Sequence, residues 1–353
     1  MTLSRIANNK TMRVAVYYNN RDIRIEERPV PSIGPGEILM QIEASGICGS
    51  DVLEWYRINR APLVLGHEVA GKVAMVGKDV TKYQKGDRIA AAHHVPCNTC
   101  HYCLNGHHTV CDTLRQTNFD PGGFAEYIRL PAINVDRGVF PLPDKLSYEE
   151  ATFIEPLACV LRGQIIARVQ PGCSVLVMGS GIAGLLHVQL AKALGARLVV
   201  ATDINNYRLD MARKMGADII LGAEENISQR VEEMNNGHLV DVVIVSTGAS
   251  SAINQSLHAV DRGGTVLLFA PTAKSVTFPI SINDLFFRND ITLTTSYAGS
   301  PADYAVACDL IGSGRIKVYE MITHRLPLVE TGRGFQLVAE AGESLKVVIQ
   351  PQK

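Results

Sequence analysis

The chain has 353 residues, 46% of them hydrophobic, and its 34 Lys and Arg residues almost balance 35 Asp and Glu residues, giving a net charge of −1. This length predicts two domains with full hydrophobic cores. The balanced charge, with no polybasic run, argues against binding to nucleic acid or to a membrane surface. The sequence has no run of about 20 apolar residues, so no membrane helix is predicted. The first ten residues lack the apolar core of a signal peptide.

We therefore expect a cytoplasmic protein whose partner is a small molecule. Its eight cysteines are too few for a disulfide scaffold in a chain of this length. In a reducing compartment, clustered cysteines more often bind metal or take part in chemistry.

The first part of the chain, up to about residue 150, is predicted to form short strands. The runs that predict them are apolar or alternate between apolar and polar residues: MRVAVYY (12–18), DIRIEE (22–27), EILMQIEAS (37–45), EVAGKVAMVG (68–77) and GDRIAAA (86–92). Pro and Gly residues separate several of them, as in turns. An antiparallel, barrel-like domain with irregular loops is expected.

Four cysteines, Cys97, Cys100, Cys103 and Cys111, follow this pattern of strands with the spacing C-x2-C-x2-C-x7-C. Four thiolates complete a tetrahedral zinc site and leave no open position, so such a site is structural. An iron–sulfur cluster is the alternative, because bacterial ferredoxins begin with the same spacing but continue with x3 and a proline. The neighbouring histidines are expected to be exposed loop residues: His93, His94, His101, His107 and His108.

A second group of metal-ligand types is spread along the chain. Cys48 lies in GICGSD, His67 and Glu68 in LGHEVAG, and Glu155 in FIEPLA. Mixed zinc sites of Cys, His and carboxylate typically keep a position for water or substrate. From the residues alone, Cys48 could equally be a small buried side chain, His67 a core histidine and Glu155 an acid at a helix start. Three further cysteines are interpreted as core residues: Cys159, Cys173 and Cys308.

From Cys173 onward, strand-like and helix-like runs alternate. The predicted strands are SVLVM (174–178), RLVVAT (197–202), DIIL (218–221), VDVVIVS (240–246), GTVLLFA (264–270) and ITLTTS (291–296). Helical spacing of apolar residues marks 182–195, 207–216 and 301–314. Short, continuously apolar strands between helices predict a doubly wound parallel sheet that is buried on both faces, and hence an α/β fold.

A glycine-rich turn, Gly179, Gly181 and Gly184 in G-x-G-x-x-G, joins the first of these strands to its helix. Such a turn lets a pyrophosphate approach the backbone at a helix N-terminus. Asp203 ends the next strand, where an acid would bind the ribose hydroxyls and repel a 2′-phosphate. The pattern therefore predicts NAD rather than NADP, with Arg208 nearby as a further cofactor contact. In the alternative, these are turn glycines and Asp203 caps a helix.

Taken together, these motifs resemble the zinc-dependent medium-chain alcohol dehydrogenases, and most closely the branch of polyol (sorbitol, L-iditol) and L-threonine dehydrogenases. The resemblance runs from about Met12 to Ile349. It rests on GICGSD, LGHEVAGKVAMVG, KGDRIA, the four-cysteine lobe, GGFAEYI, FIEPLA, VMGSGIAG, DLIGSGRIKVYEMITHRLPL and ESLKVVI, which occur in the family's order.

The resemblance implies an arrangement of domains. A GroES-like β-barrel catalytic domain would span 1–157, with the structural zinc lobe at about 93–115. A Rossmann NAD-binding domain would follow at 158–296, and 297–353 would return to the catalytic domain. The active site would lie between the domains, and the enzyme would be a homodimer or homotetramer.

The resemblance also implies roles for single residues. Cys48, His67 and Glu155 would bind the catalytic zinc, and Glu68 would bind it or approach it. Ser50 would pass on the substrate's proton, and Asp51 would orient His67. The four cysteines of the lobe would hold a structural zinc, giving two zincs per chain. Phe119 and Tyr297 would line the substrate pocket.

The implied activity is hydride transfer to NAD from a secondary alcohol of a polyol or cyclitol, giving a ketone. An L-threonine 3-dehydrogenase and a sugar-phosphate alcohol dehydrogenase, with Arg57 and Arg60 at the phosphate, are the alternatives. A non-catalytic nucleotide-binding relative is a more remote one. The chain departs from the family at Leu53, where many members have a relay histidine, and at Glu54, where sorbitol dehydrogenases often have an aromatic residue.

Overall fold

The computed structural model describes residues 11–277 and 279–353, which form two compact units. The prediction that there is no signal peptide concerns the first ten residues, which lie outside this range. The first unit comprises residues up to Ala158 together with Gly299–Gly314 and Val318–Lys353, and the second comprises Cys159–Ala298 and Arg315–Lys317. No helix in the described part of the chain is long and apolar enough to cross a membrane.

The first unit is built on two sheets. The smaller has the order β2-β1-β4 and the larger the order β15-β16-β3-β5-β6-β8, with β7 also paired to β3. All pairs are antiparallel except β15 with β16. The strands are β1 (Thr11–Asn19), β2 (Asp22–Pro29), β3 (Ile38–Gly46), β4 (Leu63–Val64), β5 (Glu68–Val76), β6 (Arg88–Ala91), β7 (Tyr127–Leu130), β8 (Val139–Pro141), β15 (Ile322–Pro327) and β16 (Lys346–Gln350).

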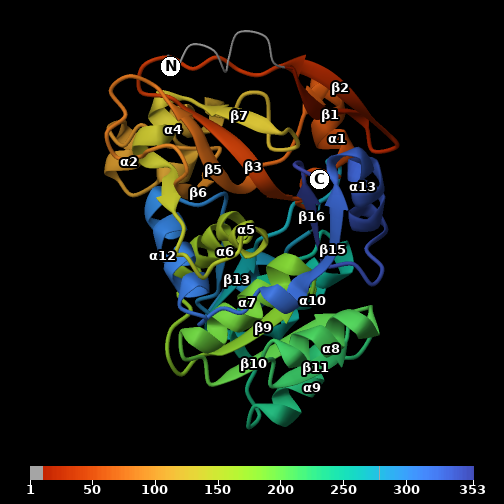
Figure 1. Ribbon diagram of the computed structural model, residues 1–353. Helices are drawn as coiled ribbons and strands as arrows, with labels where there is room; N and C mark the ends of the chain where they lie inside the picture. The colour runs from red at the N-terminus through yellow and green to blue at the C-terminus, as the bar shows by residue number, and fades with distance from the viewer. Residues whose placement is uncertain (1–10, 278) are drawn as a thin grey trace. The chain divides into compact units, whose positions relative to one another are not determined.

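The last strands of the chain thus join the first unit, where β16 pairs with β3 (Figure 1). Short helices fill the connections and α13 packs on β16. They are α1 (Glu54–Arg57), η2 (Ile58–Arg60), α2 (His101–Leu104), η3 (His108–Val110), α3 (Asp112–Gln116), α4 (Ala132–Arg137), α5 (Tyr148–Ala151), α12 (Pro301–Gly312), η4 (Tyr319–Met321), η5 (Leu328–Glu330) and α13 (Thr331–Glu340). Helix α6 (Ile154–Ile166) begins in the first unit and belongs to the second from Cys159 onward.

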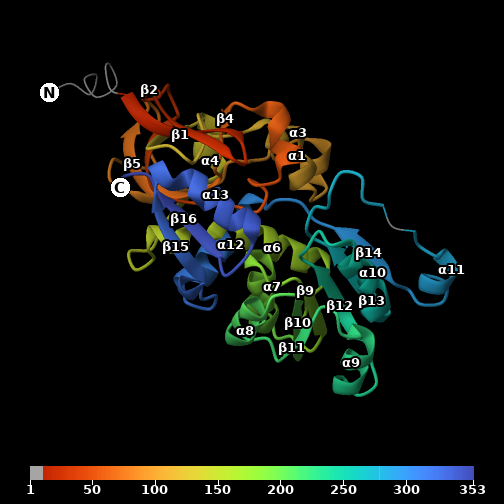
Figure 2. The ribbon, with the colours of Figure 1, turned by 90° about the vertical axis from the view of Figure 1, so that its right-hand side faces the viewer.

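The second unit is one parallel six-stranded sheet of order β11-β10-β9-β12-β13-β14 (Figure 2). Its first strand lies inside the sheet, so the strand order reverses between β9 and β12, as in doubly wound dinucleotide-binding folds. The elements are β9 (Ser174–Met178), α7 (Ile182–Ala193), β10 (Leu198–Asp203), α8 (Asn206–Lys214), β11 (Ile219–Gly222), α9 (Ile227–Met234), β12 (Val240–Val245), α10 (Ser250–Ala259), β13 (Val260–Leu268), α11 (Ile282–Leu285) and β14 (Thr292–Thr295).

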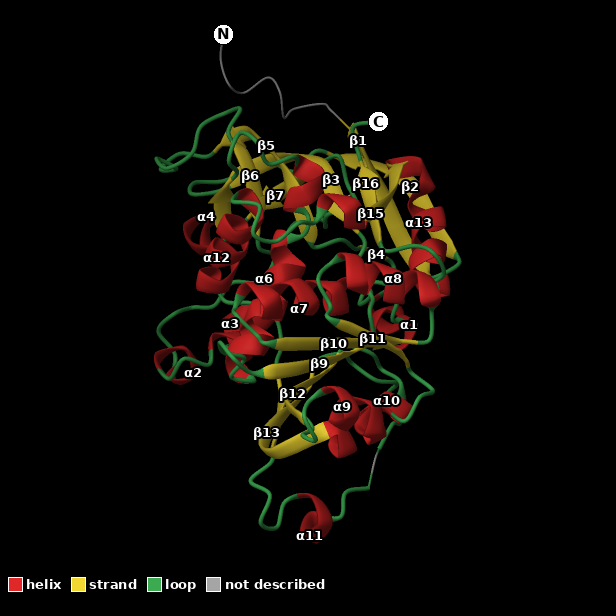
Figure 3. Ribbon diagram, turned by 90° about the horizontal axis from the view of Figure 1, so that it is seen from below, coloured by secondary structure: helices red, strands yellow, loops and turns green. Residues whose placement is uncertain are grey.

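Helices cover both faces of this sheet: α7 and α8 lie on one side, and α9 and α10 on the other (Figure 3). Every residue of β9 is buried as a result, which explains its continuous apolar sequence. The predicted α/β fold with a doubly wound sheet is therefore confirmed. Arg315–Lys317 belongs to this unit because Gln189 of α7 exchanges two hydrogen bonds with the backbone of Lys317, at 2.8 and 2.9 Å.

Aromatic rings hold the core of the first unit together. Phe335 of α13 is fully buried, and its ring lies 5.9 Å from that of Tyr17 and 5.8 Å from that of Phe124. Helix α13 is thereby fixed to β1 and to the segment that precedes β7.

We expect Phe335→Ala to lower the free energy of unfolding of the first unit by about 3–5 kcal/mol, because it leaves a cavity among buried rings. Phe287→Ala is the control, since that side chain is 67% exposed and should change stability by less than about 0.5 kcal/mol. Urea denaturation of both variants measures the difference, and equal losses would contradict this role of Phe335.

Candidate functional site

The pairing of β3 with β5 brings the scattered metal-ligand types together. Gly46 at the end of β3 lies opposite Glu68 at the start of β5, so Cys48, just beyond β3, meets His67, just before β5. One ligand atom each from Cys48, His67 and Glu68 lies within 4.8 Å of the others. A thiol, an imidazole and a carboxylate are a donor set that fits zinc.

Asp51 holds the imidazole of this group. Its carboxylate is fully buried and lies 3.4 Å from Nδ1 of His67, while its other oxygen accepts a 3.1 Å hydrogen bond from the backbone N–H of Cys48. Burial opposes the charge on Asp51, but His67 and Arg57 overcome it and hold the pKa of this carboxyl below its usual range. An ionised carboxylate at Nδ1 leaves Nε2 of His67 as the nitrogen for a metal.

Arg57 of α1 lies beside the predicted proton-transfer residue. Its Nη2 donates to Oγ of Ser50 at 3.2 Å and its Nε to the Ser50 carbonyl at 3.0 Å. The same Nη2 is 3.5 Å from Asp51. The Arg57 side chain is only 13% exposed. It links Ser50 to Asp51 through these contacts. Arg60 is exposed, with its guanidinium carbon 5.7 Å from the Tyr56 ring centre.

Glu68 is paired with Lys346, a residue for which the sequence suggested no role. Nζ of Lys346 contacts Oε2 of Glu68, and both side chains are almost fully buried. Lys346 begins β16, the strand that returns from the end of the chain to β3. Gly46 is required beside them, since a Cβ there would meet both the Glu68 carboxylate and Cε of Lys346. This buried pair fixes the Glu68 carboxylate beside Cys48 and His67.

The other residues predicted for this site are not members of the three-residue group that the described residues form. Glu155 is buried in α6 but does not belong to the group that the described residues form; it lines a small cavity with Val69 and Tyr304. Phe119 is buried, and Tyr297, in the second unit, is 48% exposed. The proposed ligand role of Glu155 and the pocket roles of Phe119 and Tyr297 stay predictions.

His93 and His94 correct the expectation of exposed loop histidines, which is wrong for both. They follow β6 and are partly buried in a row of rings, with centroids 4.8 Å apart for His67 and His93 and 3.8 Å for His93 and His94. Burial lowers the pKa of His93 well below its ordinary value and that of His94 to about 4. The signal available in the sequence was their position directly after a buried strand. His101 and His107 are exposed as expected, whereas His108 is partly buried in η3, so the expectation is wrong for it as well.

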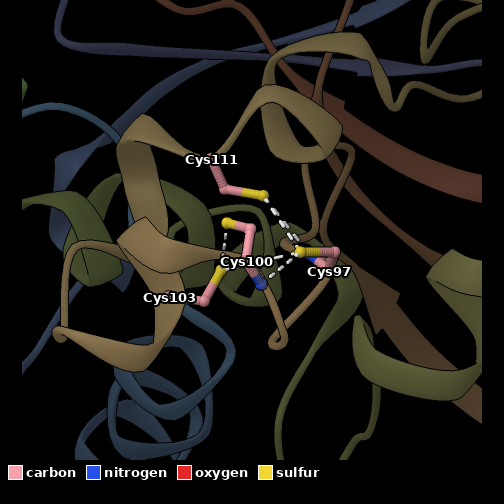
Figure 4. A group of neighbouring side chains, drawn as sticks. All are labelled: Cys97, Cys100, Cys103 and Cys111. Atoms are coloured by element: carbon pink, nitrogen blue, oxygen red, sulfur yellow. Dashed lines mark hydrogen bonds between the residues drawn. The ribbon is translucent and has the colours of Figure 1, made fainter.

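The four cysteines of the lobe converge on one point (Figure 4). Neighbouring sulfurs are 3.6 Å apart for Cys100 and Cys103, 3.6 Å for Cys97 and Cys111, and 4.0 Å for Cys97 and Cys103. Tetrahedral zinc with bonds of about 2.3 Å needs sulfurs about 3.8 Å apart. A disulfide needs about 2.05 Å, and an iron–sulfur cluster would need room for several metal ions and sulfides. The spacing therefore fits a single zinc ion.

The pKa values of two thiols in the lobe are shifted in opposite directions. Hydrogen bonds from the backbone of Thr99 and Cys100 lower the pKa of Cys97 to about 5. Burial and the adjacent Cys100 thiol raise the pKa of Cys103 to about 12. Four thiolates this close repel one another, so all four can be ionised together only around a positive ion.

The glycine-rich turn of the second unit has the shape that a dinucleotide needs. A Cβ on Gly184 would collide with the Gly179 carbonyl, whereas one on Gly181 would meet only Nη1 of Arg208, at 3.9 Å. The backbone at Gly181 is therefore open to a ligand at the start of α7. The buried carboxylate of Asp203 accepts hydrogen bonds from the backbone N–H groups of Ser180 at 2.7 Å and Asn205 at 2.9 Å, which fixes it at the end of β10.

Comparisons with known proteins agree with this geometry. Residues 34–144 match the alcohol dehydrogenase GroES-like domain, and 183–313 match the zinc-binding dehydrogenase domain. Sorbitol dehydrogenase of Bacillus subtilis is 33% identical, with 98% of each chain covered. The chain belongs to the zinc-dependent medium-chain alcohol dehydrogenases. The predicted family is thereby confirmed, as is the predicted enzyme class.

Two further relatives show the breadth of this family. L-Threonine 3-dehydrogenase of Bacillus licheniformis is 34% identical over 92% of this chain and 94% of its own. A zinc-binding dehydrogenase of Sinorhizobium meliloti, solved with NADP bound, is 28% identical with a TM-score of 0.86, covering 97% of this chain and all of that one. Full-length likeness to enzymes with different substrates shows the reaction class and leaves the alcohol to be identified.

Replacing Lys346 by Met should be severely destabilising, because it leaves the Glu68 carboxylate buried without a counter-ion. We expect a loss of about 3–5 kcal/mol in the free energy of unfolding. Lys72→Met is the matched control: Lys72 is 44% exposed in its ion pair with Glu43, and such pairs contribute about 0–1 kcal/mol. Similar losses for the two variants in denaturant titrations would contradict a buried ionised pair.

Replacing Cys100 by Ser should remove one zinc per chain and loosen the lobe, because a tetrahedral site loses one of its four thiolates. Cys173→Ser is the control, since Cys173 is buried in the second unit and belongs to neither metal-ligand group; it should keep both zincs. Elemental analysis gives the zinc content and thermal unfolding the stability. Full zinc content and unchanged stability in Cys100→Ser would overturn the structural site.

Proposed function

We propose that this protein oxidises a secondary alcohol of a polyol or cyclitol to a ketone, with NAD as hydride acceptor and two zincs per chain. The observation that carries the proposal is the occurrence, in one chain, of two different metal-ligand groups and a dinucleotide-binding turn. The Cys48, His67 and Glu68 group has three donors, which leaves a position for substrate. The cysteine lobe has four, which leaves none.

The residues of the open group have distinct tasks in this proposal. Cys48 and His67, with Glu68 or Glu155, would hold the zinc. When bound, zinc would polarise the alcohol, and NAD would accept the hydride. Asp51 keeps His67 in the tautomer that presents Nε2, because its carboxylate lies at Nδ1.

Ser50 would hold the substrate oxygen while its proton leaves. Its Oγ accepts a hydrogen bond from Arg57, and it would take up the substrate's proton while its own hydroxyl proton passes on. Arg57 cannot take up a proton at neutral pH, and Leu53 stands where a relay histidine is common in the family. We therefore propose that the proton leaves through water.

NAD is preferred in this proposal because the buried Asp203 carboxylate stands at the end of β10, where a 2′-phosphate would be repelled. The Sinorhizobium meliloti relative solved with NADP makes a direct comparison of the two cofactors necessary. The alternative activity is that of an L-threonine 3-dehydrogenase, which the similar identity of 34% to such an enzyme supports.

Assembly and location complete the proposal. We propose a homodimer or homotetramer, on the family resemblance described above. A cytoplasmic location is supported by the eight cysteines, which are all free thiols in the described structure, as expected in a reducing compartment.

The test is NADH formation by zinc-loaded enzyme with polyols, cyclitols, sugar phosphates and L-threonine, each with NAD and NADP in parallel. Activity on a polyol or cyclitol with NAD is expected, and Cys48→Ala should lower kcat/KM at least about 1,000-fold through loss of a ligand to the reacting metal. Cys173→Ser should retain activity. Turnover of L-threonine alone would favour the alternative, and full activity of a metal-replete Cys48→Ala would contradict the zinc assignment.

A further inference from the structure

Arg57 contacts the residue that is expected to carry the substrate's proton. Nη2 of Arg57 donates a hydrogen bond to Oγ of Ser50 at 3.2 Å, and its Nε donates to the Ser50 carbonyl at 3.0 Å. The arginine ends α1, only seven residues after the serine, so one short segment of the first unit contains both. Because Oγ accepts from Arg57, the hydrogen of the Ser50 hydroxyl points elsewhere and remains available to another oxygen.

The guanidinium is held from two further sides. Its Cζ lies 4.6 Å from the centre of the Tyr56 ring, and Nη2 lies 3.5 Å from Oδ1 of Asp51. The same Oδ1 lies 3.4 Å from Nδ1 of His67, so the Asp51 carboxylate is shared and does not neutralise Arg57 alone. The arginine side chain is 13% exposed, and water therefore screens its charge less than that of a free surface arginine.

The proton has no basic partner at the position where the family often has one. Leu53 has no group that binds a proton, and Arg57 stays protonated at any pH used in an assay. In the proposed function the proton therefore leaves through water. While it leaves, negative charge develops on Oγ of Ser50, and a fixed cation within hydrogen-bond distance stabilises such a charge.

We propose that Arg57 is a positioning residue for this proton transfer, whose guanidinium charge stabilises the negative charge that develops on Oγ of Ser50. In this step the O–H bond of the substrate breaks as its proton binds Oγ. The original O–H bond of Ser50 breaks as its proton binds a water molecule, and no electrons are transferred. The inference rests on the proposed function, because it needs an alcohol that loses its proton beside Ser50.

The first test is Arg57→Ala in the zinc-loaded enzyme, with NAD and the polyol or cyclitol that has the highest kcat/KM in the screen. The value of kcat should fall at least about 10-fold, with KM little changed, because Arg57 acts through Ser50. The solvent deuterium isotope effect on kcat should rise as proton transfer becomes limiting. Arg333→Met is the control, since Arg333 is 62% exposed in its ion pair with Glu330, and it should change neither value.

Chemical rescue separates the charge of the side chain from its shape. Arg57→Ala leaves a space of the size of a guanidinium ion. Millimolar guanidinium should restore part of kcat, at concentrations far below those that unfold proteins. Urea has a similar shape and similar donors but no charge, so it should not restore kcat.

Two further variants separate the charge from the backbone contact. The amide nitrogen of Gln reaches the position of Nε, so Arg57→Gln can keep the bond to the Ser50 carbonyl without the charge, whereas Arg57→Lys keeps the charge without that bond. The Lys variant should retain more of kcat. Proton release when 1,1,1-trifluoro-2-propanol binds the enzyme–NAD complex should follow the same order. Calorimetry in buffers of different ionisation enthalpy measures this release without turnover, since the fluorines slow hydride loss.

The outcomes distinguish this inference from the proposed function. If alcohols are oxidised but Arg57→Ala keeps full kcat, or if urea rescues it as well as guanidinium does, the role of Arg57 is wrong and the dehydrogenase stands. If no alcohol in the wider screen is oxidised, the proposed function fails. If Arg57→Ala does not fold, the Lys and Gln variants decide, and equal kcat in those two would overturn the inference.

Discussion

The buried ion pair between Glu68 and Lys346 is the constraint around which the first unit is organised. A carboxylate removed from water without a counter-ion would be strongly destabilising, so the chain must bring a cation to it. That cation comes from β16, 278 residues further along, which pairs with β3 beside the metal group. The end of the chain thereby completes a site whose other members lie among the first 70 residues. Gly46 is part of the same constraint because no side chain fits between the two charges.

The two metal-ligand groups differ in the same way as a closed and an open coordination site. The cysteine lobe places four sulfurs at zinc-like separations, and nothing else can approach an ion held there. The Cys48, His67 and Glu68 group offers three donors. Polar side chains beside it form hydrogen bonds and ion pairs with its residues and with Ser50. Asp51 and Arg57 position the residues of the group. In the proposed function, the second group carries the chemistry and the first is structural because of this difference in coordination.

Sequence reasoning worked well where a local pattern determines the outcome. The strand segments 175–178 and 242–245 are apolar throughout because helices cover both sheet faces, and the glycine turn lies between strand and helix as its spacing predicts. It worked less well where distant segments meet. Lys346 was part of a recognised motif, but only the pairing of β16 with β3 shows that it neutralises Glu68. His93 and His94 looked like loop residues because they adjoin the cysteine lobe, although the end of β6 carries them inward. Arg57 was considered for a phosphate, and its hydrogen bonds to Ser50 depend on a turn that spacing does not reveal.

The central claim is that the chain holds one closed and one open zinc site. X-ray absorption at the zinc edge of the purified two-zinc enzyme tests it most directly. In total, the two four-coordinate ions would have five sulfur ligands, four from the lobe and one from Cys48, at about 2.3 Å and three nitrogen or oxygen ligands at about 2.0–2.2 Å. The predicted average per zinc is therefore about 2.5 sulfur and about 1.5 nitrogen or oxygen ligands. Coordination by sulfur alone, or a single zinc per chain in the fully loaded protein, would contradict it.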